Sequence, residues 1–242
     1  MRRKEFMARI WSKLALAQKK EGLVAKGKGV LAAVSGGPDS TCLAHYLVSL
    51  RRRLSFPLEL AYIDHGLRKE ALEEAAFVRL LGRKWGVTVS ILKVDAPGAR
   101  KSRGLGLEEA CRKLRYQALL AQAERLRFSA VAVGHQMDDQ AETVLLNLLR
   151  GVKLKALGAM PPRRNLSSKV QLIRPLLCLK RSEILDYLKI HQIDYKIDET
   201  NSNLELSRNW IRHMVFPLLE EKNPRIREHL AGISEQVRAL RL

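Results

Sequence analysis

The sequence predicts an α/β fold: a doubly wound, mostly parallel five-stranded sheet with a helical C-terminal appendage. Three observations support this prediction. Short apolar runs alternate with longer segments of helical periodicity, two of these runs end in glycine turns, and 242 residues suffice to bury a full core. Such an alternation forms right-handed βαβ units, whose parallel strands are covered by helices on both faces.

The elements follow from these patterns in chain order. We expect strands at the apolar runs 30–34, 59–63, 87–94, 129–133 and 170–173. Helical periodicity covers residues 39–53, 69–85, 107–127 and 138–150. The polar, proline-rich stretch 161–169 is predicted to be a mobile loop, and the tail 180–242 to be helices broken at Pro217 and Pro224.

The chain divides into three parts by pattern. Residues 1–27 form a basic amphipathic N-terminal segment, residues 28–178 the α/β domain, and residues 179–242 a helical C-terminal part. Lys and Arg number 44 against 25 Asp and Glu, a net charge of +19. An imbalance of this size attracts a polyanion, so nucleic acid is the expected partner.

Membrane and redox roles are not expected. No apolar run reaches the roughly 18 residues of a membrane span, and the basic start of the chain does not resemble a signal peptide, so we expect a cytoplasmic protein without a membrane partner. Cys42, Cys111 and Cys178 are widely separated and form no C-x-x-C pair. They are predicted to be core or near-core residues and not a disulfide framework or metal cluster.

The most informative segment is 35–40, between the first predicted strand and the first predicted helix. Its glycines let backbone N–H groups approach a phosphate, and the helix start adds positive charge. Asp39 stands where the P-loop motif G-x-x-x-x-G-K-[ST] would have lysine, and a carboxylate beside phosphates indicates a metal ion. The predicted anion cradle comprises Ser35, Gly36, Gly37, Pro38, Asp39 and Ser40.

A second polar segment, 134–143, also joins a predicted strand to a helix. Asp139 and Glu142 are three residues apart and share a helix face, while Asp138 can cap the first turn. These carboxylates suit Mg²⁺ beside a phosphate loop, although an acidic first turn is also common without a metal. Because ligands bind beyond the carboxyl ends of parallel strands, we expect loops 35–40, 64–68 and 134–139 to border one crevice.

Several segments, taken in order, resemble the bacterial tRNA(Ile)-lysidine synthetase family, N-type ATP pyrophosphatases of the PP-loop superfamily. The resemblance covers residues 28–220 and implies an adenine nucleotide α-hydrolase-like fold. Members of the family continue into C-terminal domains that hold the tRNA, so we expect this chain to be a compact form or a catalytic part. The segments are S-G-G-P-D-S at 35–40 and those at 65–68, 107–116, 134–151, 174–177, 198–201 and 208–212.

The resemblance implies ligation of lysine to C2 of the wobble cytidine (position 34) of tRNA(Ile) with a CAU anticodon, through an adenylated cytidine. The cosubstrates are ATP and L-lysine, the cofactor is Mg²⁺, and the oligomeric state stays open, a homodimer included. Residues 179–242 would complete the site and bind tRNA. The expected groups are Asp39, Asp139, Arg112 and Arg212 for catalysis, Asp39 and Asp139 for the metal, His65, Arg115 and His135 with the 35–40 loop for the nucleotide, and Asp138, Glu142 and Arg208 for the substrates.

Other functions share some of these features. A tRNA 2-thiolation enzyme has the same glycine loop, but such enzymes use additional cysteines. A noncatalytic RNA-binding module would gain nothing from carboxylates beside its basic surface, and a small-molecule synthetase would not need a charge of +19. Arg225 and Arg227 are expected to be surface residues that bind RNA phosphates without sequence preference.

Overall fold

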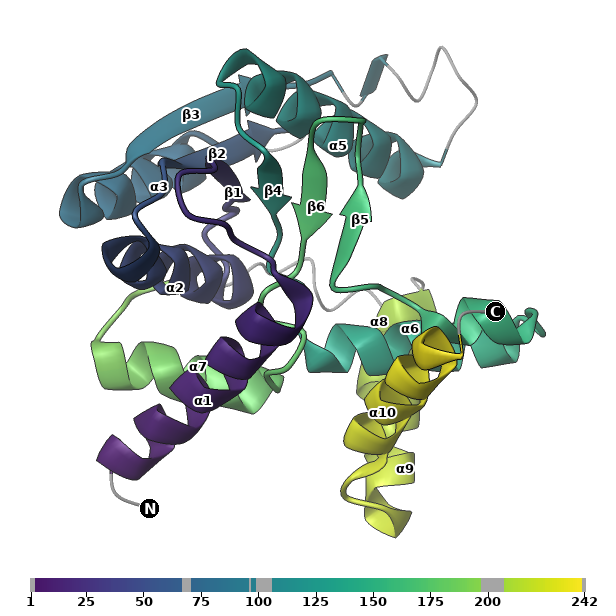
Figure 1. The fold of residues 1–242 in the computed structure, drawn as a ribbon. Helices are drawn as coiled ribbons and strands as arrows, with labels where there is room; N and C mark the ends of the chain where they lie inside the picture. Colours follow the sequence, from purple (N-terminus) through teal and green to yellow (C-terminus); the bar gives the residue numbers. More distant parts are fainter. Residues whose placement is uncertain (1–2, 67–70, 96, 99–105, 197–206, 241–242) are drawn as a thin grey trace.

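The computed structural model describes residues 3–66, 71–95, 97–98, 106–196 and 207–240. It contains one six-stranded sheet in the order β3-β2-β1-β4-β6-β5 (Figure 1). All neighbouring pairs are parallel except the antiparallel edge pair of β5 and β6, which confirms the predicted fold class. The strands are β1 (Val30–Ala33), β2 (Leu58–Asp64), β3 (Thr88–Lys93), β4 (Ala130–Ala132), β5 (Arg163–Asn165) and β6 (Gln171–Ile173).

The strand order reverses at the centre of the sheet. Val30 of β1 is in register with Leu58 of β2 on one side and with Ala130 of β4 on the other. The carboxyl ends of β1 and β4 therefore lie side by side at the point where the strand order reverses. In doubly wound sheets this is where ligands bind.

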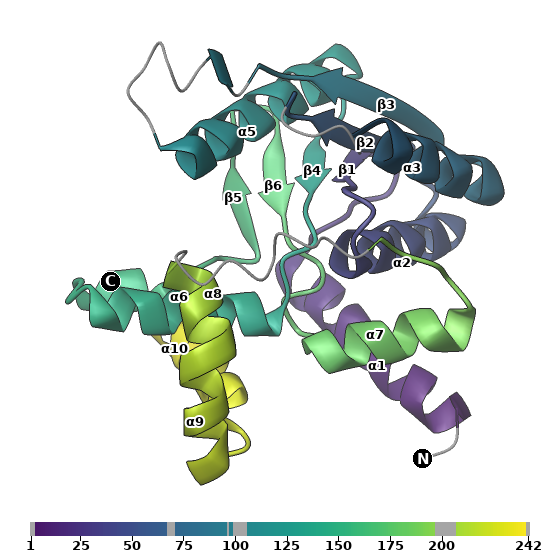
Figure 2. The same ribbon diagram turned by 180° about the vertical axis from the view of Figure 1, so that it is seen from behind.

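Helices cover both faces of the sheet, as Figures 1 and 2 show. Alternate residues of β1 separate the two cores: Val30 and Ala32 pack with α1, α2, α3 and α7, and Leu31 packs with α5. This alternation is the period of a strand that is buried on both sides. The helices are α1 (Arg3–Glu21), α2 (Pro38–Leu54), α3 (Ala71–Trp85), α5 (Leu107–Arg125), α6 (Met137–Leu149) and α7 (Arg181–His191).

The C-terminal helices form a third cluster around α6, to one side of the sheet (Figures 1 and 2). Ala141 and Val144 of α6 pack against Ile211, Phe216 and Leu230. This packing brings the last part of the chain to the helix that begins at the acidic loop after β4. Its elements are the 3₁₀ turn η1 (Leu154–Gly158), α8 (Ser207–Trp210), the π-helical turn η3 (Ile211–Val215), α9 (Phe216–Lys222) and α10 (Ile226–Ala239).

Two expectations about the elements were wrong. The stretch 161–169 contains the short strand β5, so the sheet has six strands and not five. Pro217 does not break its helix, because the preceding turn is π-helical and Phe216 N–H bonds to Ile211 O, while Pro217 occupies a first-turn position of α9 that needs no N–H donor. Pro224 does lie between α9 and α10.

The domain boundaries proposed at residues 27 and 178 stay predictions.

The cysteines lie where the sequence predicted. Cys42 is buried in the first core and Cys178 packs at its edge, as expected of core or near-core residues. Within the described ranges, no helix is both long and apolar enough to cross a membrane. The segments 67–68 and 198–201 lie outside the described residues.

Candidate active site

The loop after β1 forms a tight polar turn at the start of α2. Gly36 has a φ of +89°, a left-handed conformation that disfavours any side chain, and Gly37 is the N-cap residue of α2. The Ser40 hydroxyl donates to Gly37 O at 2.9 Å, and Ser35 N–H donates to Ser40 Oγ at 3.2 Å. Pro38 opens the helix, so the turn is fixed by glycine geometry, proline and serine together.

The loop after β4 reaches the same turn. A Cβ atom on Gly134 would lie 3.0 Å from Asp39 C and 3.0 Å from Ser40 N, so only glycine allows this approach. The predicted convergence of loops 35–40 and 134–139 is therefore confirmed. The two loops meet at the switch point of the sheet.

Asp39 is the central carboxylate of this crevice. Its Oδ2 accepts a hydrogen bond from Nη1 of Arg181, the first residue of α7, while its buried Oδ1 has no hydrogen-bond partner among the described residues. Burial raises the pKa of Asp39 to about 6, Asp139 acts in the same direction, and Arg181 and Arg212 oppose both. An additional cation at Oδ1 would relieve this destabilised charge.

Asp139 anchors the start of α6. Its Oδ2 accepts from Gln136 N–H at 3.0 Å, and Gln136 Oε1 accepts from Asp138 N–H at 2.6 Å, which together form a capping box. Its Oδ1 lies 3.4 Å from Nη2 of Arg212. One oxygen of Asp139 therefore orients the helix, and the other faces the charged cluster.

Glu142 and Arg212 form a buried ion pair. Arg212 Nε donates to Glu142 Oε1 at 2.6 Å, and Nη2 donates to Oε2 at 3.0 Å, while the Glu142 side chain has no solvent exposure. Burial raises the pKa of Glu142, and the two hydrogen bonds from Arg212 lower it. The π-helical turn that contains Arg212 thus binds the C-terminal helices to the acidic face of α6.

Asp138 faces a different partner. Its Oδ2 lies 3.9 Å from Arg227 Nη1, and its Oδ1 accepts from the Arg181 backbone N–H at 3.5 Å. Burial raises the pKa of Asp138, and Arg227 is the main group that opposes this rise. Arg181 therefore links the two acidic loops, since its side chain binds Asp39 and its backbone reaches Asp138.

Two histidine–arginine pairs lie near the acidic cluster: His65 with Arg115, and His135 with Arg174. Arg115 Nη2 lies 3.5 Å from His65 Nε2, which brings the loop after β2 to the N-terminal half of α5. Arg174 Nε donates to His135 Nδ1 at 3.2 Å. The positive charge of Arg115 also contributes to lowering the pKa of His135, so the two pairs are electrostatic neighbours.

The donor set fits a magnesium ion that shares its coordination with phosphate. No three His, Cys, Asp or Glu side chains of the described residues are grouped so that they alone would hold a metal. Mg²⁺ is usually bound by one or two carboxylates together with substrate phosphates and water. Asp39 with its unpartnered Oδ1, and Asp139 with its Oδ1 facing the charged cluster, meet this requirement.

The remaining predicted residues divide into two groups. Arg208 belongs to the cluster, because its Nη2 donates to Thr143 Oγ1 at 3.2 Å and its charge affects Glu142. Arg112 is exposed on α5 and bonds to no cluster residue in the described ranges, although its charge acts on Arg174.

Sequence reasoning missed the roles of Arg181 and Arg174 and misplaced Arg227. The position of Arg181 could have indicated its role. A cation at the first position of a helix is destabilised by the helix dipole, so it indicates a carboxylate nearby. Arg227 was expected to be a surface residue, but its side chain is only 18% exposed, pairs with Glu220 at 2.6 Å and stacks on Phe216. Arg225, at 70% side-chain exposure, is a surface residue as expected.

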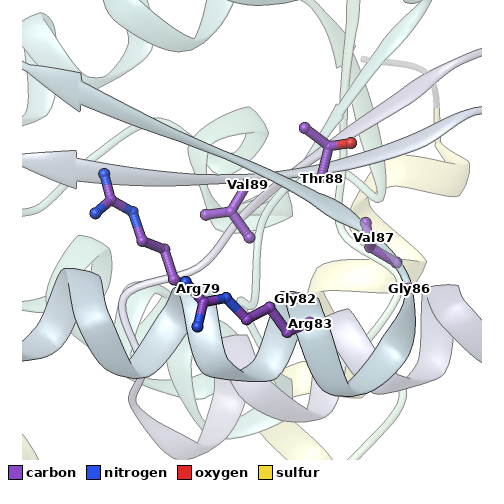
Figure 3. A pocket seen from close by; sticks show the side chains of 7 residues that line it. All are labelled: Arg79, Gly82, Arg83, Gly86, Val87, Thr88 and Val89. Carbon is purple, nitrogen blue, oxygen red and sulfur yellow. The ribbon is translucent and has the colours of Figure 1, made fainter.

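One pocket of the described residues lies elsewhere. It has a volume of about 480 Å³ at the turn from α3 to β3, between Arg79, Arg83 and Val89 (Figure 3). This turn precedes β3 and is therefore at the amino edge of the parallel strands. The conserved geometry of doubly wound sheets places ligands at the opposite edge, where the charged cluster lies.

Comparison with known proteins finds relatives of most of this chain. Residues 8–219 match the PP-loop domain family. The tRNA(Ile)-lysidine synthase of Thermotoga maritima is 36% identical over 206 residues, which are 85% of this chain and 49% of that protein. The synthase of Dehalococcoides mccartyi is 40% identical over 215 residues, covering 87% and 46%. The chain thus spans about half the length of these curated relatives.

Solved structures share the fold at low identity. The U34-tRNA thiolase NcsA of Methanococcus maripaludis, solved with its [4Fe-4S] cluster, has a TM-score of 0.77 at 20% identity, with coverage of 95% of this chain and 78% of that one. An NH3-dependent NAD synthetase of Campylobacter jejuni has a TM-score of 0.52 at 16% identity, with coverage of 98% and 94%.

Proposed function

Since this chain belongs to the PP-loop domain family, we propose that its crevice binds ATP and adenylates a cytidine of tRNA, to which lysine is then joined. The product would be lysidine at the wobble position of tRNA(Ile) with a CAU anticodon. The observation that carries the proposal is the meeting of the glycine loop with the acidic loop, with Gly134 against the backbone of Asp39 and Ser40. Identities of 36% and 40% to two tRNA(Ile)-lysidine synthases support the choice of substrate.

The nucleotide phosphates would lie against the turn at 35–40. The start of α2 offers backbone N–H groups and the positive end of a helix, and Ser35 and Ser40 add hydroxyls only 3.2 Å apart. Mg²⁺ held by Asp39 and Asp139 would neutralise charge on the phosphates. The protein's main contribution to this step is to position the reacting atoms and neutralise charge.

The first reaction joins the cytidine to AMP. The cytidine O2 attacks the α-phosphorus, the bond to the β-phosphate oxygen breaks, and pyrophosphate leaves. To reach the phosphate, the base must leave its stack in the anticodon loop. His65, which lies 3.5 Å from Arg115, and Tyr116 would support the base.

The second reaction replaces AMP with lysine. The ε-amine attacks C2 of the cytidine, the C2–O2 bond breaks with the departure of AMP, and the amine loses a proton to a carboxylate. An unperturbed lysine amine has a pKa of about 10.4, so an acceptor must lie close. Both oxygens of Glu142 already bind Arg212, which leaves Asp138 and Asp139 as the better acceptors.

The charge of +19 supports an RNA substrate over a small molecule. A direct test measures pyrophosphate release from labelled ATP with this chain. We expect release to require a tRNA transcript with a CAU anticodon and to disappear when the wobble cytidine is changed to uridine. Release without RNA would instead indicate a small-molecule synthetase, and RNA binding without release would indicate a noncatalytic module.

The thiolation alternative makes a separate prediction about cysteine. Cys42 is buried, and burial raises the pKa of its thiol; burial also raises the pKa of the Cys178 thiol to about 11. Both changes disfavour the reactive thiolate. Replacing Cys42, Cys111 and Cys178 together by Ala should retain pyrophosphate release in folded protein, whereas its loss would favour sulfur transfer.

A further inference from the structure

Arg174 and His135 meet where two neighbouring strands end. His135 follows β4 and Arg174 follows β6, which pair in parallel. Arg174 Nε donates to His135 Nδ1 at 3.2 Å, and Nη1 donates to Pro161 O at 2.7 Å. The Arg174 residue is only 5% exposed, so its guanidinium is held from two sides within the protein.

This contact determines which imidazole nitrogen carries the proton. A guanidinium has only N–H donors and no acceptor, and it stays charged in proteins. Nδ1 of His135 must therefore be the acceptor, and the single proton of the neutral ring is on Nε2. Burial is the main cause that lowers the pKa of His135 to about 4; the charges of Arg174, Arg208 and Arg115 act in the same direction, and Asp139 opposes them.

His135 is joined to the residue that contacts the glycine loop. His135 directly follows Gly134, whose backbone lies against Asp39 and Ser40. In the part of the chain that the structure describes, the only hydrogen bond of His135 is the one from Arg174 to Nδ1. Nε2–H is thus a donor available to a ligand at the start of α2.

We propose that Arg174 is a positioning residue that holds His135 as a neutral donor, and that His135 Nε2–H binds an acceptor atom of the nucleotide. The identity of the ligand rests on the proposed function. The tautomer of His135 does not, because it follows from the contact with Arg174. It assigns His135 no role as a base, because the free nitrogen is the protonated one. Proton removal from lysine is left to the carboxylates.

The tautomer can be measured without any ligand. NMR of the full chain with ¹⁵N-labelled histidine reports the protonation of each ring nitrogen, and His135→Asn identifies the signals of His135. We expect Nδ1 to resonate as an unprotonated nitrogen and Nε2 as a protonated one at pH 7. A proton on Nδ1 would overturn the proposal even if the protein proves to be an active synthetase.

Added ATP tests the ligand. We expect ATP to shift the Nε2–H signal of His135 and leave Nδ1 unprotonated. If ATP binds, as measured by calorimetry, without changing this signal, the assigned contact is wrong. If no ATP binds, the proposed function fails together with the ligand part of the inference, whereas the tautomer result remains separate.

A double-mutant cycle tests whether Arg174 acts through His135. His135→Phe removes the hydrogen bond to the nucleotide, and Arg174→Met removes the hydrogen bond that orients His135. Each variant should therefore weaken ATP binding about tenfold. The Kd of the double variant for ATP should be within about twofold of that of the single variant that binds ATP less tightly, since both changes remove the same contact. If the losses of ATP-binding free energy in the two single variants simply add in the double variant, Arg174 does not act through His135.

Two further variants serve as controls for the role of the Arg174 guanidinium. Arg174→Lys keeps the charge but loses the geometry of the guanidinium, so it should bind ATP as weakly as Arg174→Met. Arg163→Met, at an exposed arginine on the neighbouring strand β5, should leave ATP affinity unchanged. If Arg174→Met does not fold, the wild-type tautomer and the ATP-induced shift still decide the proposal.

Discussion

Arg181 Nη1 donates to Asp39 Oδ2, and the other carboxylate oxygen, Oδ1, is buried without a hydrogen-bond partner in the described ranges. The two residues are 142 positions apart in the sequence. Arg181 thus orients Asp39 so that one oxygen is held and the other is available to a cation. This arrangement is the basis for the predictions on Asp39.

Asp39→Asn should abolish pyrophosphate release while tRNA affinity changes less than about twofold, because the substitution keeps the shape but removes the charge that would hold Mg²⁺. Single-turnover kinetics with labelled ATP measure the first quantity, and filter binding measures the second. Ser35→Ala, which removes one hydroxyl of the same loop, serves as a control and should retain measurable release. Release at the wild-type rate from Asp39→Asn would remove Asp39 from the mechanism.

The same substitution should stabilise the fold at neutral pH. The folded state raises the pKa of Asp39 from 3.8 to about 6, so it binds the proton more tightly than the unfolded chain. Stability from this group is fully present below pH 3.8 and is lost as the pH rises through about 6. In urea unfolding, Asp39→Asn should be more stable than wild type by about 3 kcal/mol at pH 7, and this difference should shrink toward pH 4. A pH-independent difference would contradict this reading.

Arg212→Ala should destabilise the protein as well as impair catalysis. It leaves the fully buried Glu142 carboxylate without its two hydrogen-bond donors, at a cost of about 3–5 kcal/mol. Glu142→Gln with Arg212→Met removes both charges and should be much less destabilised than Arg212→Ala. Equal stability losses for these variants in urea would show that the ion pair is not the cause.

His45 should make the fold sensitive to acid. Its Nδ1 lies 2.7 Å from Tyr187 Oη, and burial, with smaller effects of His191, Arg52 and Lys84, lowers its pKa from 6.5 to about 4. The neutral ring stabilises the fold above pH 6.5, and this stability is lost as the pH falls toward 4.

The test compares wild type with His45→Gln, which cannot titrate in this range. Relative to that variant, wild type should lose about 2 kcal/mol of unfolding free energy between pH 7 and pH 4.5. The comparison cancels the opposite pH effect of Asp39, which both proteins share. A constant difference across this range would mean that His45 does not titrate as the structure implies.

Arg225 and Arg227 should behave differently despite their proximity in sequence. Arg227 stacks 3.9 Å from the centre of the Phe216 ring and pairs with Glu220, so Arg227→Ala should cost about 1–3 kcal/mol of stability. Arg225→Ala should leave stability unchanged, and it should reduce the salt dependence of tRNA binding only if Arg225 contacts a phosphate. Thermal unfolding of both variants is the measurement, and equal melting temperatures would contradict the assignment.

The sheet could be predicted because buried parallel strands are continuous apolar runs, such as Val30–Ala33. β5 could not, since it reads Arg-Arg-Asn and exists through its pairing with β6 at the sheet edge. The π-helical turn before Pro217 is likewise set by tertiary packing around Phe216. Local pattern carries no information on such long-range support.

The candidate site divides in the same way. The glycine loop could be predicted from glycine geometry, but the cap of α6 could not: the sequence favoured Asp138, whereas Gln136 and Asp139 form the capping box. The pairing of Arg212 with Glu142 joins residues 70 apart, and that of Arg174 with His135 joins residues 39 apart. Only the folded chain brings these cations to the carboxylates and the imidazole.

The most direct test of the central claim is covalent transfer of labelled L-lysine to a tRNA transcript by this chain with ATP and Mg²⁺. We predict label that remains on a CAU-anticodon tRNA(Ile) transcript after denaturation, one pyrophosphate and one AMP per lysine joined, and no label when the wobble cytidine is uridine. Folded protein that binds the transcript and ATP but transfers no lysine, or transfers it regardless of the wobble base, would contradict the claim.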